Sequence, residues 1–294
     1  MSATPSNGPS LPDVPAQIIP LWNDTPPGGA RQKVAKAPPG KPELIMGIAN
    51  PRLHMVRPAK PNGQAILVIP GGGYTVIALQ HEGFDVAHAL VQRGFVVFIL
   101  EYRLPDEGWN ERATVALQDG QRAMRQIRAS AAQYGFSPDA VSVLGFSAGG
   151  HLAASLLTGA DHRLYEPRDA IDQWDARPRV GGLIYPVTLL HDPFGVPFVT
   201  EALLGKAAAP DLLRRHSPAD SIGPDTPPAF LVHAFDDDVV PYQNAVLFAE
   251  AMRASRRPVE LHLFEKGGHG FGLGAPDAPA GHWLDLFTAF LRRH

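Results

Sequence analysis

Ser147 stands at the centre of the run Gly145–Gly149, which reads Gly-Phe-Ser-Ala-Gly and fits the pattern G-x-S-x-G. A strand-like run, Val141–Leu144, precedes it, and a run of small residues and leucine follows it. In that context the pattern predicts a nucleophile elbow, in which the serine lies on a sharp turn between a strand and a helix. Such a turn brings the chain close to itself on both sides of the serine, which explains the flanking glycines. The alternative is a glycine-rich turn without a chemical role.

A general base and a carboxylate are needed beside this serine, because a serine hydroxyl is a weak nucleophile until a base takes its proton. Asp236–Asp238 follows an apolar run that ends at Phe235, and His269 lies among glycines after a run that ends at Phe264. The order serine, aspartate, histidine is the order of α/β-hydrolases. Each loop alone also fits ordinary turn chemistry or a helix cap.

A third loop, Pro70–Tyr74, offers main-chain N–H groups to a developing oxyanion. It follows the apolar run 64–69 and contains three consecutive glycines. Lipases and esterases place an HGGG loop here and pair it with the N–H that follows the nucleophile, so Gly72, Gly73 and Ala148 are the expected donors. In this chain proline replaces the histidine of that loop. Phosphate cradling would require G-x-x-x-x-G-K-[ST] or G-x-G-x-x-G, and neither pattern is present.

The elements that must position these loops are buried-strand runs that alternate with segments of helical spacing. This alternation predicts an α/β fold, a mostly parallel central sheet with helices on both faces. On one predicted helix Arg122, Arg125 and Arg128 recur every third residue, and we expect them to form a solvated face. A strand pair, 43–49 with 53–57, is expected at a sheet edge. The expected inner strands are 64–69, 95–100, 141–144, 182–185, 229–235 and 259–264, and the main helices are 82–94, 113–133, 241–254 and 283–293.

Three regions follow from the distribution of proline and glycine. Residues 1–43 are rich in both and predict an arm on the surface, which the apolar run Ile18–Trp22 could anchor. Residues 44–294 are expected to form a single catalytic domain. Within it, 186–228 is too long for an ordinary connection and predicts a lid or binding loop.

The composition excludes several function classes. The 294 residues carry a formal charge of −3 without long charged blocks, which argues against nucleic acid or an anionic membrane as a partner. The chain has no cysteine, which removes disulfides, thiol catalysis and cysteine metal sites. Its first residues show neither a basic start nor an apolar core of a signal peptide, so we expect a cytoplasmic protein. An oligomer is possible if the proline-rich arm crosses to a partner subunit.

These motifs together resemble the α/β-hydrolase superfamily, and more narrowly its acetyl-esterase and xylan-esterase-like branch of BD-FAE-like serine esterases. The family pattern H-x-x-x-D-x-x-V-P falls on residues 233–241 and selects Asp237 as the triad acid, with Asp238 as the lesser alternative. Ala234 stands where relatives usually have glycine. The other matching pieces, which span almost everything after Ile18, are 21–22, 70–74, 81–83, 102–104, 117–123, 145–153, 217–218, 261–264 and 267–272.

The resemblance implies a Ser147, Asp237 and His269 triad that hydrolyses a short acyl ester, most often acetyl on a sugar hydroxyl, without metal or organic cofactor. It also implies that Tyr74 and Glu82 lie near the acyl-binding end of the site. The substrate would be a small-molecule or oligosaccharide ester. Two alternatives stay open: an amide hydrolase on the same fold, arylformamidase-like or peptidase-like, and a ligand-binding homologue without catalysis.

Overall fold

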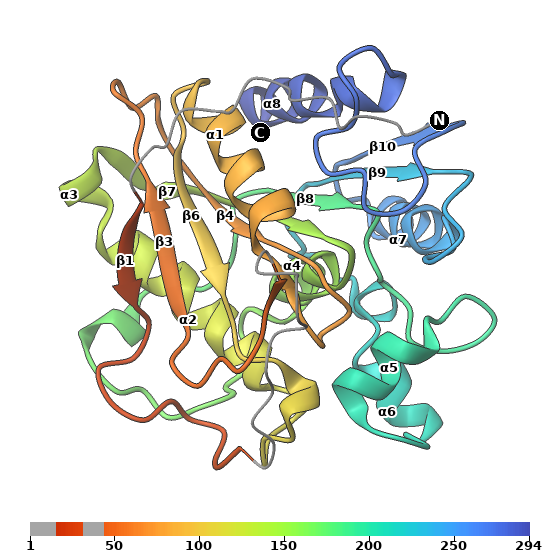
Figure 1. The fold of residues 1–294 in the computed structure, drawn as a ribbon, viewed down its shortest axis with the longest axis horizontal. Coiled ribbons are helices and arrows are strands. Elements are labelled where there is room, and N and C mark those ends of the chain that lie inside the picture. Colours follow the sequence, from red (N-terminus) through yellow and green to blue (C-terminus); the bar gives the residue numbers. More distant parts are fainter. Residues whose placement is uncertain (1–15, 32–43) are drawn as a thin grey trace, which may run out of the picture.

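The computed structural model describes residues 16–31 and 44–294, and its core is an eight-stranded sheet (Figure 1). Six neighbouring strands of this sheet pair in parallel. The two remaining strands lie at one edge of the sheet, where they are antiparallel to each other and the inner one is antiparallel to the adjacent parallel strand. In spatial order the strands are β1 (Gln17–Pro20), β3 (Arg52–Val56), β6 (Val96–Glu101), β4 (Gly63–Ile69), β7 (Phe136–Phe146), β8 (Gly181–Ile184), β9 (Ala229–Ala234) and β10 (Val259–Phe264).

The central strands are continuous apolar runs because helices cover both of their faces. Every residue of β6, β8 and β9 is buried. On β8, a Cβ added to Gly181 would meet Leu157 of α4 (Ser147–Gly159), whereas one added to Gly182 would meet Phe287 of α8 (Trp283–Arg293). Consecutive residues of a strand point to opposite faces. The two helices therefore cover opposite faces, and the predicted fold class is confirmed.

The remaining helices complete these two layers. An ion pair, Arg93–Asp285 at 2.6 Å, ties the turn after α1 (Asp85–Val91) to α8, while α2 (Val115–Ala129) packs against α4. In Figure 1, α1 accordingly lies in front of the sheet and α2 behind it. The other helices are α3 (Ala131–Tyr134), α5 (Pro197–Leu204), α6 (Pro210–Arg215) and α7 (Gln243–Ala254). Shorter turns are Leu79–Phe84, Pro105–Glu107, Ala170–Gln173, Pro218–Ser221 and Pro279–His282.

The expected strand pair at the sheet edge is wrong in its pairing. The strand β2 (Leu44–Ile45) pairs with β5 (Ile77–Ala78) in a separate two-stranded sheet. One edge of β3 is bonded to β6 and the other to β1, so β3 has no free edge for β2. The residues Gln17–Pro20 of the predicted arm thus form the outer strand, and the buried Leu21 and Trp22 follow it. The remainder of that arm, 1–15 and 32–43, lies outside the described residues.

The predicted solvated arginine face is also wrong. Arg122 is 2% exposed and Arg128 is 8% exposed. Arg122 pairs with Asp169 at 2.6 Å and with Asp172 at 2.9 Å, so the loop after α4 covers this side of α2 and neutralises its charge. A three-residue spacing identifies a helix face but not what packs on it, and here the covering carboxylates lie 47 and 50 residues further along the chain than Arg122.

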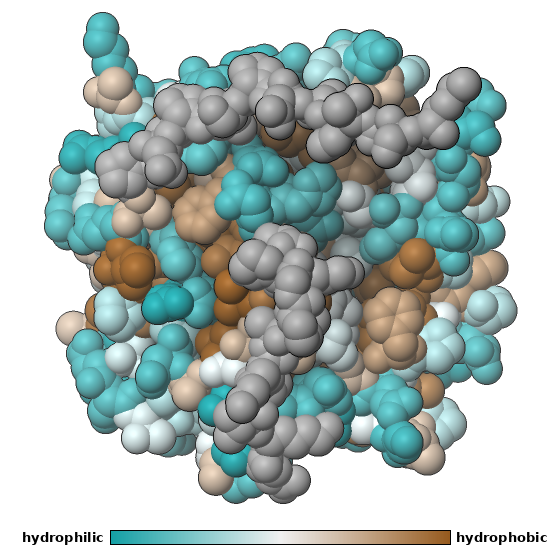
Figure 2. Space-filling model, in the orientation of Figure 1, coloured by the Kyte–Doolittle hydropathy of each residue, from teal (hydrophilic) through white to brown (hydrophobic). Residues whose placement is uncertain are grey.

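Five large apolar side chains are exposed among the described residues, namely Ile18, Trp174, Phe198, Phe235 and Val239. On the face that Figure 2 presents, apolar patches lie among hydrophilic residues. Within residues 16–31 and 44–294, no helix has the length and apolar character that crossing a membrane requires.

Candidate active site

The turn at Ser147 has the strained geometry of a nucleophile elbow. Strand β7 ends at Phe146, α4 begins at Ser147, and Ser147 has φ of 51°, a left-handed conformation that is costly for a serine. A Cβ on Gly145 would lie 2.3 Å from the carbonyl oxygen of Gly149, and one on Gly149 would lie 2.2 Å from that of Ile69. Both glycines are therefore required by close backbone approach, for the reason that the sequence suggested.

Ser147, His269 and Asp237 form one hydrogen-bonded chain. The Ser147 Oγ lies 2.9 Å from His269 Nε2, and His269 Nδ1 lies 2.8 Å from Asp237 Oδ2. The three residues follow β7, β10 and β9, whose carboxyl ends share one edge of the sheet because these strands are parallel. Because Asp237 accepts a hydrogen bond from the Nδ1–H group, Nε2 is left to accept the proton of the serine hydroxyl.

Asp237 is held as a carboxylate by four donors. Its Oδ1 accepts the N–H groups of Val239 at 3.0 Å and Val240 at 2.9 Å, while its Oδ2 accepts from His269 and, at 3.1 Å, from His233 Nε2. Burial alone would raise the pKa of Asp237, but the hydrogen bonds from His233, His269 and Val240 outweigh it and hold that pKa well below its usual range. The carboxylate that meets His269 is thus the one selected by the family pattern.

The neighbouring Asp236 stiffens the histidine loop instead. Its Oδ1 accepts the N–H groups of Gly267 at 2.9 Å and Gly268 at 2.8 Å, one and two residues before His269. These hydrogen bonds, Gly268 above all, lower the pKa of Asp236. Asp236 therefore fixes the loop that carries the imidazole.

The glycine loop after β4 lies directly against the serine. A Cβ on Gly71 would be 2.8 Å from Ser147 Cβ, and Gly72 and Gly73 have φ of 128° and 66°. Within the described part of the chain, the N–H groups of Gly72 and Gly73 donate to no protein group. Ala148 is the second residue of α4, where an N–H has no partner inside the helix. The three expected oxyanion donors are therefore unpaired groups on two segments that meet at Ser147.

The Glu82 side chain holds the glycine loop through a hydrogen bond from the Gly71 N–H. Glu82 is 4% exposed, and its Oε2 accepts the Gly71 N–H at 2.7 Å. Burial raises the pKa of Glu82, although hydrogen bonds from Gly71 and Tyr185 and the nearby His269 oppose that rise. Tyr74 is likewise buried, and its hydroxyl lies 2.8 Å from His151 Nδ1. Both residues thus support the loop from inside, and their contact with substrate stays a prediction.

Tyr185 is a site residue that the sequence analysis did not identify. Its hydroxyl donates to Glu82 Oε1 at 2.9 Å and accepts the Gly272 N–H at 3.0 Å, so it bridges the glycine loop and the histidine loop. Its ring meets the His269 ring edge-on at 5.1 Å between centroids. The residue has φ of 37°, an uncommon conformation for tyrosine, and no local sequence pattern announces it.

His233 was placed in the family pattern without a role. It is fully buried at the penultimate position of β9, and its Nε2 lies 3.1 Å from Asp237 Oδ2 and 3.0 Å from the Val240 carbonyl oxygen. Because a carbonyl only accepts, Nε2 carries a proton, and His233 donates to the same carboxylate oxygen of Asp237 as His269 does. The spacing of four residues between His233 and Asp237 is the feature of the sequence that could have indicated this contact.

An exposed aromatic residue lies against the glycine loop. Phe198 of α5 is 51% exposed, and its ring would lie 2.8 Å from a Cβ built on Gly73. The segment 186–228 thus lies against the glycine loop at Gly73, while its movement as a lid stays a prediction. Among the described residues, no group of three histidine, cysteine or acidic side chains is placed to hold a metal ion.

Two family models match the chain in consecutive stretches. The model described as BD-FAE matches residues 53–178, and that of the prolyl oligopeptidase family matches residues 201–294. The first stretch contains the glycine loop and Ser147, and the second contains Asp237 and His269.

The relatives carry esterase and hydrolase names. An acetylxylan esterase of Xylanibacter ruminicola is 31% identical over 221 residues, which cover 74% of this chain and 43% of that protein. The chain thus spans less than half the length of this relative. The crystal structure of an acetyl ester-xyloside bifunctional hydrolase from Caldicellulosiruptor lactoaceticus superposes with a TM-score of 0.78 at 32% identity, covering 94% of this chain and 96% of that chain. A propionate-bound thermophilic esterase from Thermogutta terrifontis has a TM-score of 0.70 at 26% identity and covers 91% and 94% of the two chains.

Proposed function

The chain belongs to the α/β-hydrolase superfamily, in its acetyl-esterase and xylan-esterase-like branch, and from this we propose that it is a serine hydrolase that cleaves short-chain acyl esters. The single observation that carries the proposal is the hydrogen-bonded chain from Ser147 Oγ through His269 to Asp237, with distances of 2.9 and 2.8 Å. That chain lies beside unpaired main-chain N–H groups, which is the arrangement acyl transfer requires.

In the proposed reaction His269 Nε2 takes the proton of Ser147 as Oγ attacks the ester carbonyl. The oxyanion is held by the N–H groups of Gly72, Gly73 and Ala148 while Asp237 stabilises the imidazolium. The C–O bond to the alcohol then breaks, and the alcohol leaves with the proton from His269. Water, deprotonated by the same imidazole, attacks the acyl-enzyme and releases the carboxylic acid and free Ser147.

We further propose acetyl as the acyl group and a carbohydrate as the alcohol. The names of two relatives, an acetylxylan esterase and an acetyl ester-xyloside hydrolase, support this choice. Phe198 supports it as well, because an exposed ring beside the oxyanion loop offers an apolar surface to the C–H face of a sugar.

Covalent labelling of the active serine tests the reaction. A fluorophosphonate probe should label Ser147 of the folded wild-type protein, as mapped by mass spectrometry. Ser147→Ala should abolish labelling, while the matched control Ser155→Ala, on the same helix but bonded only to the His151 carbonyl, should leave it unchanged. A wild-type protein that is folded but not labelled would refute the serine mechanism and favour a ligand-binding homologue.

A second candidate function is amide hydrolysis on the same site. It is favoured by the match of residues 201–294 to the prolyl oligopeptidase family. Rates on p-nitrophenyl acetate and acetylated xylose, compared with N-formylkynurenine and aminoacyl amides, separate the two. Higher kcat/KM on the amides would reverse the order of the two proposals.

A further inference from the structure

A single buried imidazole joins three parts of the candidate site. His151 lies on α4, four residues after Ser147, and it is 3% exposed. Its Nδ1 lies 2.8 Å from the hydroxyl oxygen of Tyr74, the last residue of the glycine loop 70–74. Its Nε2 lies 2.8 Å from the carbonyl oxygen of His216, which directly follows α6 in the segment 186–228. The nucleophile helix, the glycine loop and the segment 186–228 are therefore connected through one side chain.

The direction of both hydrogen bonds follows from their partners. The His216 carbonyl can only accept, so Nε2 of His151 carries a proton and donates. Burial lowers the pKa of His151 to about 4, so the imidazole is neutral at neutral pH and its Nδ1 is an acceptor. The Tyr74 hydroxyl therefore donates to Nδ1. Loss of either hydrogen bond would leave a buried polar atom without a partner, which is costly.

The glycine loop is strained at the residue that His151 binds. Tyr74 has φ of 62°, and Gly73 before it has φ of 66°, so two consecutive residues are left-handed. A tyrosine keeps such a conformation only where its surroundings hold it. The Tyr74 side chain is buried, and its hydroxyl is bonded to His151. We therefore expect this hydrogen bond to fix the backbone at Tyr74, and with it the neighbouring Gly73 N–H, one of the expected oxyanion donors.

The carbonyl that His151 binds belongs to a well-fixed part of the segment 186–228. Ser217 stands next to His216 in the chain and is fully buried. Its hydroxyl accepts the Leu190 N–H at 2.9 Å and donates to the Leu213 carbonyl oxygen at 2.8 Å. Because Leu213 is part of α6, these bonds tie the start of the segment to α6 and fix the position of the His216 carbonyl.

We propose that the segment 186–228 positions the oxyanion donors of the glycine loop through His151. His151 is then a positioning residue, because it bonds to the loop and not to the reacting atoms. A segment that only binds substrate would affect KM, and most strongly for large esters. A segment that positions the oxyanion donors would affect kcat even for the smallest ester, because the oxyanion forms only in the transition state. The inference rests on the proposed function, since these donors act only where an oxyanion forms.

Three substitutions interrupt this connection at different points, with p-nitrophenyl acetate as the substrate. Tyr74→Phe removes the hydroxyl that donates to Nδ1, and His151→Gln removes Nδ1 while its amide can still donate to His216. Loss of a whole oxyanion donor lowers kcat about 10²–10³-fold, so a displaced donor should lower it about 10–100-fold in each variant, with KM within about twofold. Ser217→Ala loosens the far end of the connection without changing His151 or Tyr74, and it should lower kcat about 3–10-fold.

Combined substitutions test whether the three points act in series. His151→Gln added to Tyr74→Phe should lower kcat no further than Tyr74→Phe alone, because the connection is already broken. For the same reason Ser217→Ala should leave kcat unchanged in the Tyr74→Phe background. If Tyr74→Phe does not fold, His151→Gln serves as that background.

A trifluoromethyl ketone gives a second readout, because its tetrahedral adduct with the active serine carries an oxyanion. Its Ki should rise in proportion to the loss of kcat/KM across the variants. A change in stability alone would not produce that proportionality.

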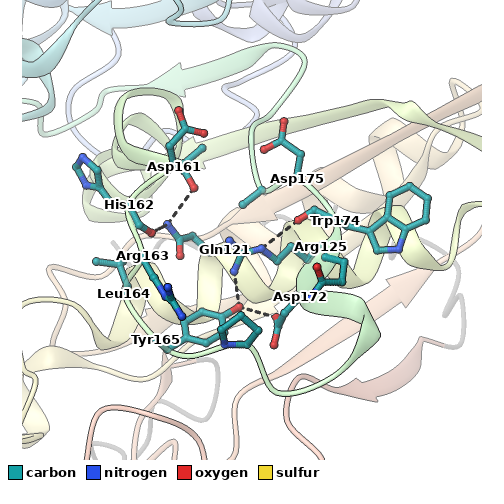
Figure 3. Close-up of a pocket in the computed structure, with 14 residues that line it drawn as sticks. Gln121, Arg125, Asp161, His162, Arg163, Leu164, Tyr165, Asp172, Trp174 and Asp175 are labelled. Atoms are coloured by element: carbon teal, nitrogen blue, oxygen red, sulfur yellow. Dashed lines mark hydrogen bonds between the residues drawn. The ribbon is translucent and has the colours of Figure 1, made fainter.

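Tyr165→Phe is the matched control. The Tyr165 hydroxyl also makes two hydrogen bonds, donating to Asp172 at 2.8 Å and accepting from Arg125 at 2.6 Å. Figure 3 shows these three side chains together in a pocket that Ala160 also lines, directly after α4 and so at the opposite end of that helix from Ser147. The control should lose stability in urea unfolding but keep kcat and the Ki of the ketone within about twofold of wild type.

Two results would overturn the inference. One is that Tyr74→Phe and His151→Gln are folded in urea unfolding but keep kcat within about twofold of wild type, or change KM alone. The other is that Ser217→Ala lowers kcat by the same factor with and without Tyr74→Phe, because the segment would then act by another route. The wild type separates the two proposals. If it hydrolyses p-nitrophenyl acetate and the variants do so equally well, the positioning alone is refuted, whereas a folded wild type that cleaves no ester refutes the proposed function as well.

Discussion

Replacing Tyr185 by phenylalanine removes one oxygen that joins the two halves of the candidate site. The hydroxyl donates to Glu82 Oε1 and accepts from the Gly272 N–H, and both of these groups are buried. The phenyl ring can keep the contacts that the tyrosine ring makes with His269 and Phe271. The substitution therefore tests the bridge with little change in packing.

Two consequences can be given magnitudes. Each buried polar group left without a partner costs about 1–3 kcal/mol, so the free energy of unfolding should fall by about 2–6 kcal/mol if no water replaces the hydroxyl. Glu82 is held by two hydrogen bonds, from the Tyr185 hydroxyl and from the Gly71 N–H, and the substitution removes the first. The carboxylate then fixes Gly71 less firmly, and the oxyanion loop loosens. Loss of a whole oxyanion donor costs about 10²–10³ in rate. A displaced donor should cost less, so we expect kcat to fall about 10–100-fold with little change in KM, because the oxyanion forms only in the transition state.

The pH profile gives a readout that a purely structural role would not move. The hydrogen bond from Tyr185 lowers the pKa of Glu82, so its loss raises that pKa further. A protonated Glu82 holds the Gly71 N–H less strongly, and the acid limb of the pH–rate profile should shift to higher pH in Tyr185→Phe.

The assays are urea unfolding and steady-state hydrolysis of p-nitrophenyl acetate from pH 5 to 9. Tyr134→Phe is the matched control, since Tyr134 is also buried but its hydroxyl reaches only Gln17, at 3.4 Å. If Tyr185→Phe loses stability but keeps kcat within twofold and an unshifted acid limb, the bridge does not position the oxyanion loop. If neither stability nor kcat changes, the hydrogen bonds have no energetic role.

Asp237→Asn should lower kcat about 10⁴-fold, because the amide no longer orients His269 for proton transfer. The folded state depresses the pKa of Asp237, so the wild type should also lose stability on acidification below about pH 4, and the variant should lose less. Gly149→Ala should destabilise by several kcal/mol, because its Cβ would lie 2.2 Å from the Ile69 oxygen, whereas Gly223→Ala meets nothing within 4 Å and should be nearly neutral in urea unfolding. Burial lowers the pKa of His151 to about 4 in the folded protein, so the unfolded chain takes up this proton at higher pH than the folded chain does. The free energy of unfolding of the wild type should therefore fall by about 3 kcal/mol between pH 6.5 and pH 4. His151→Gln should remove most of that slope; an unchanged slope would contradict the assignment.

Much of the candidate site could be read from local pattern. The elbow around Ser147 needs glycines within two residues, and the candidate base and the three candidate acids each follow an apolar run, so short windows of sequence located the serine, the histidine and the aspartate loop. Apolar runs with helical segments between them likewise indicated a parallel sheet, because burial of a strand on both faces leaves the same apolar signature wherever the strand lies.

Contacts between distant segments could not be read in this way. The arginines of α2 were expected in solvent, yet Arg122 is covered by a loop that carries Asp169 and Asp172. The partner of β2 was misplaced because pairing depends on which strand edges are free, and β1 occupies the edge of β3.

The sequence by itself indicated the candidate nucleophile, the candidate base, a loop of three candidate acids and the class of the sheet, since each depends on steric or apolar rules that act over a few residues; the family resemblance selected Asp237 from the three. Only the tertiary structure decided that Tyr185 and Glu82 couple the glycine loop to the histidine loop and that His233 donates to Asp237. The physical reason is that a buried polar atom is stabilised by whichever hydrogen-bond partner folding brings within about 3 Å. That partner can lie at any distance along the sequence.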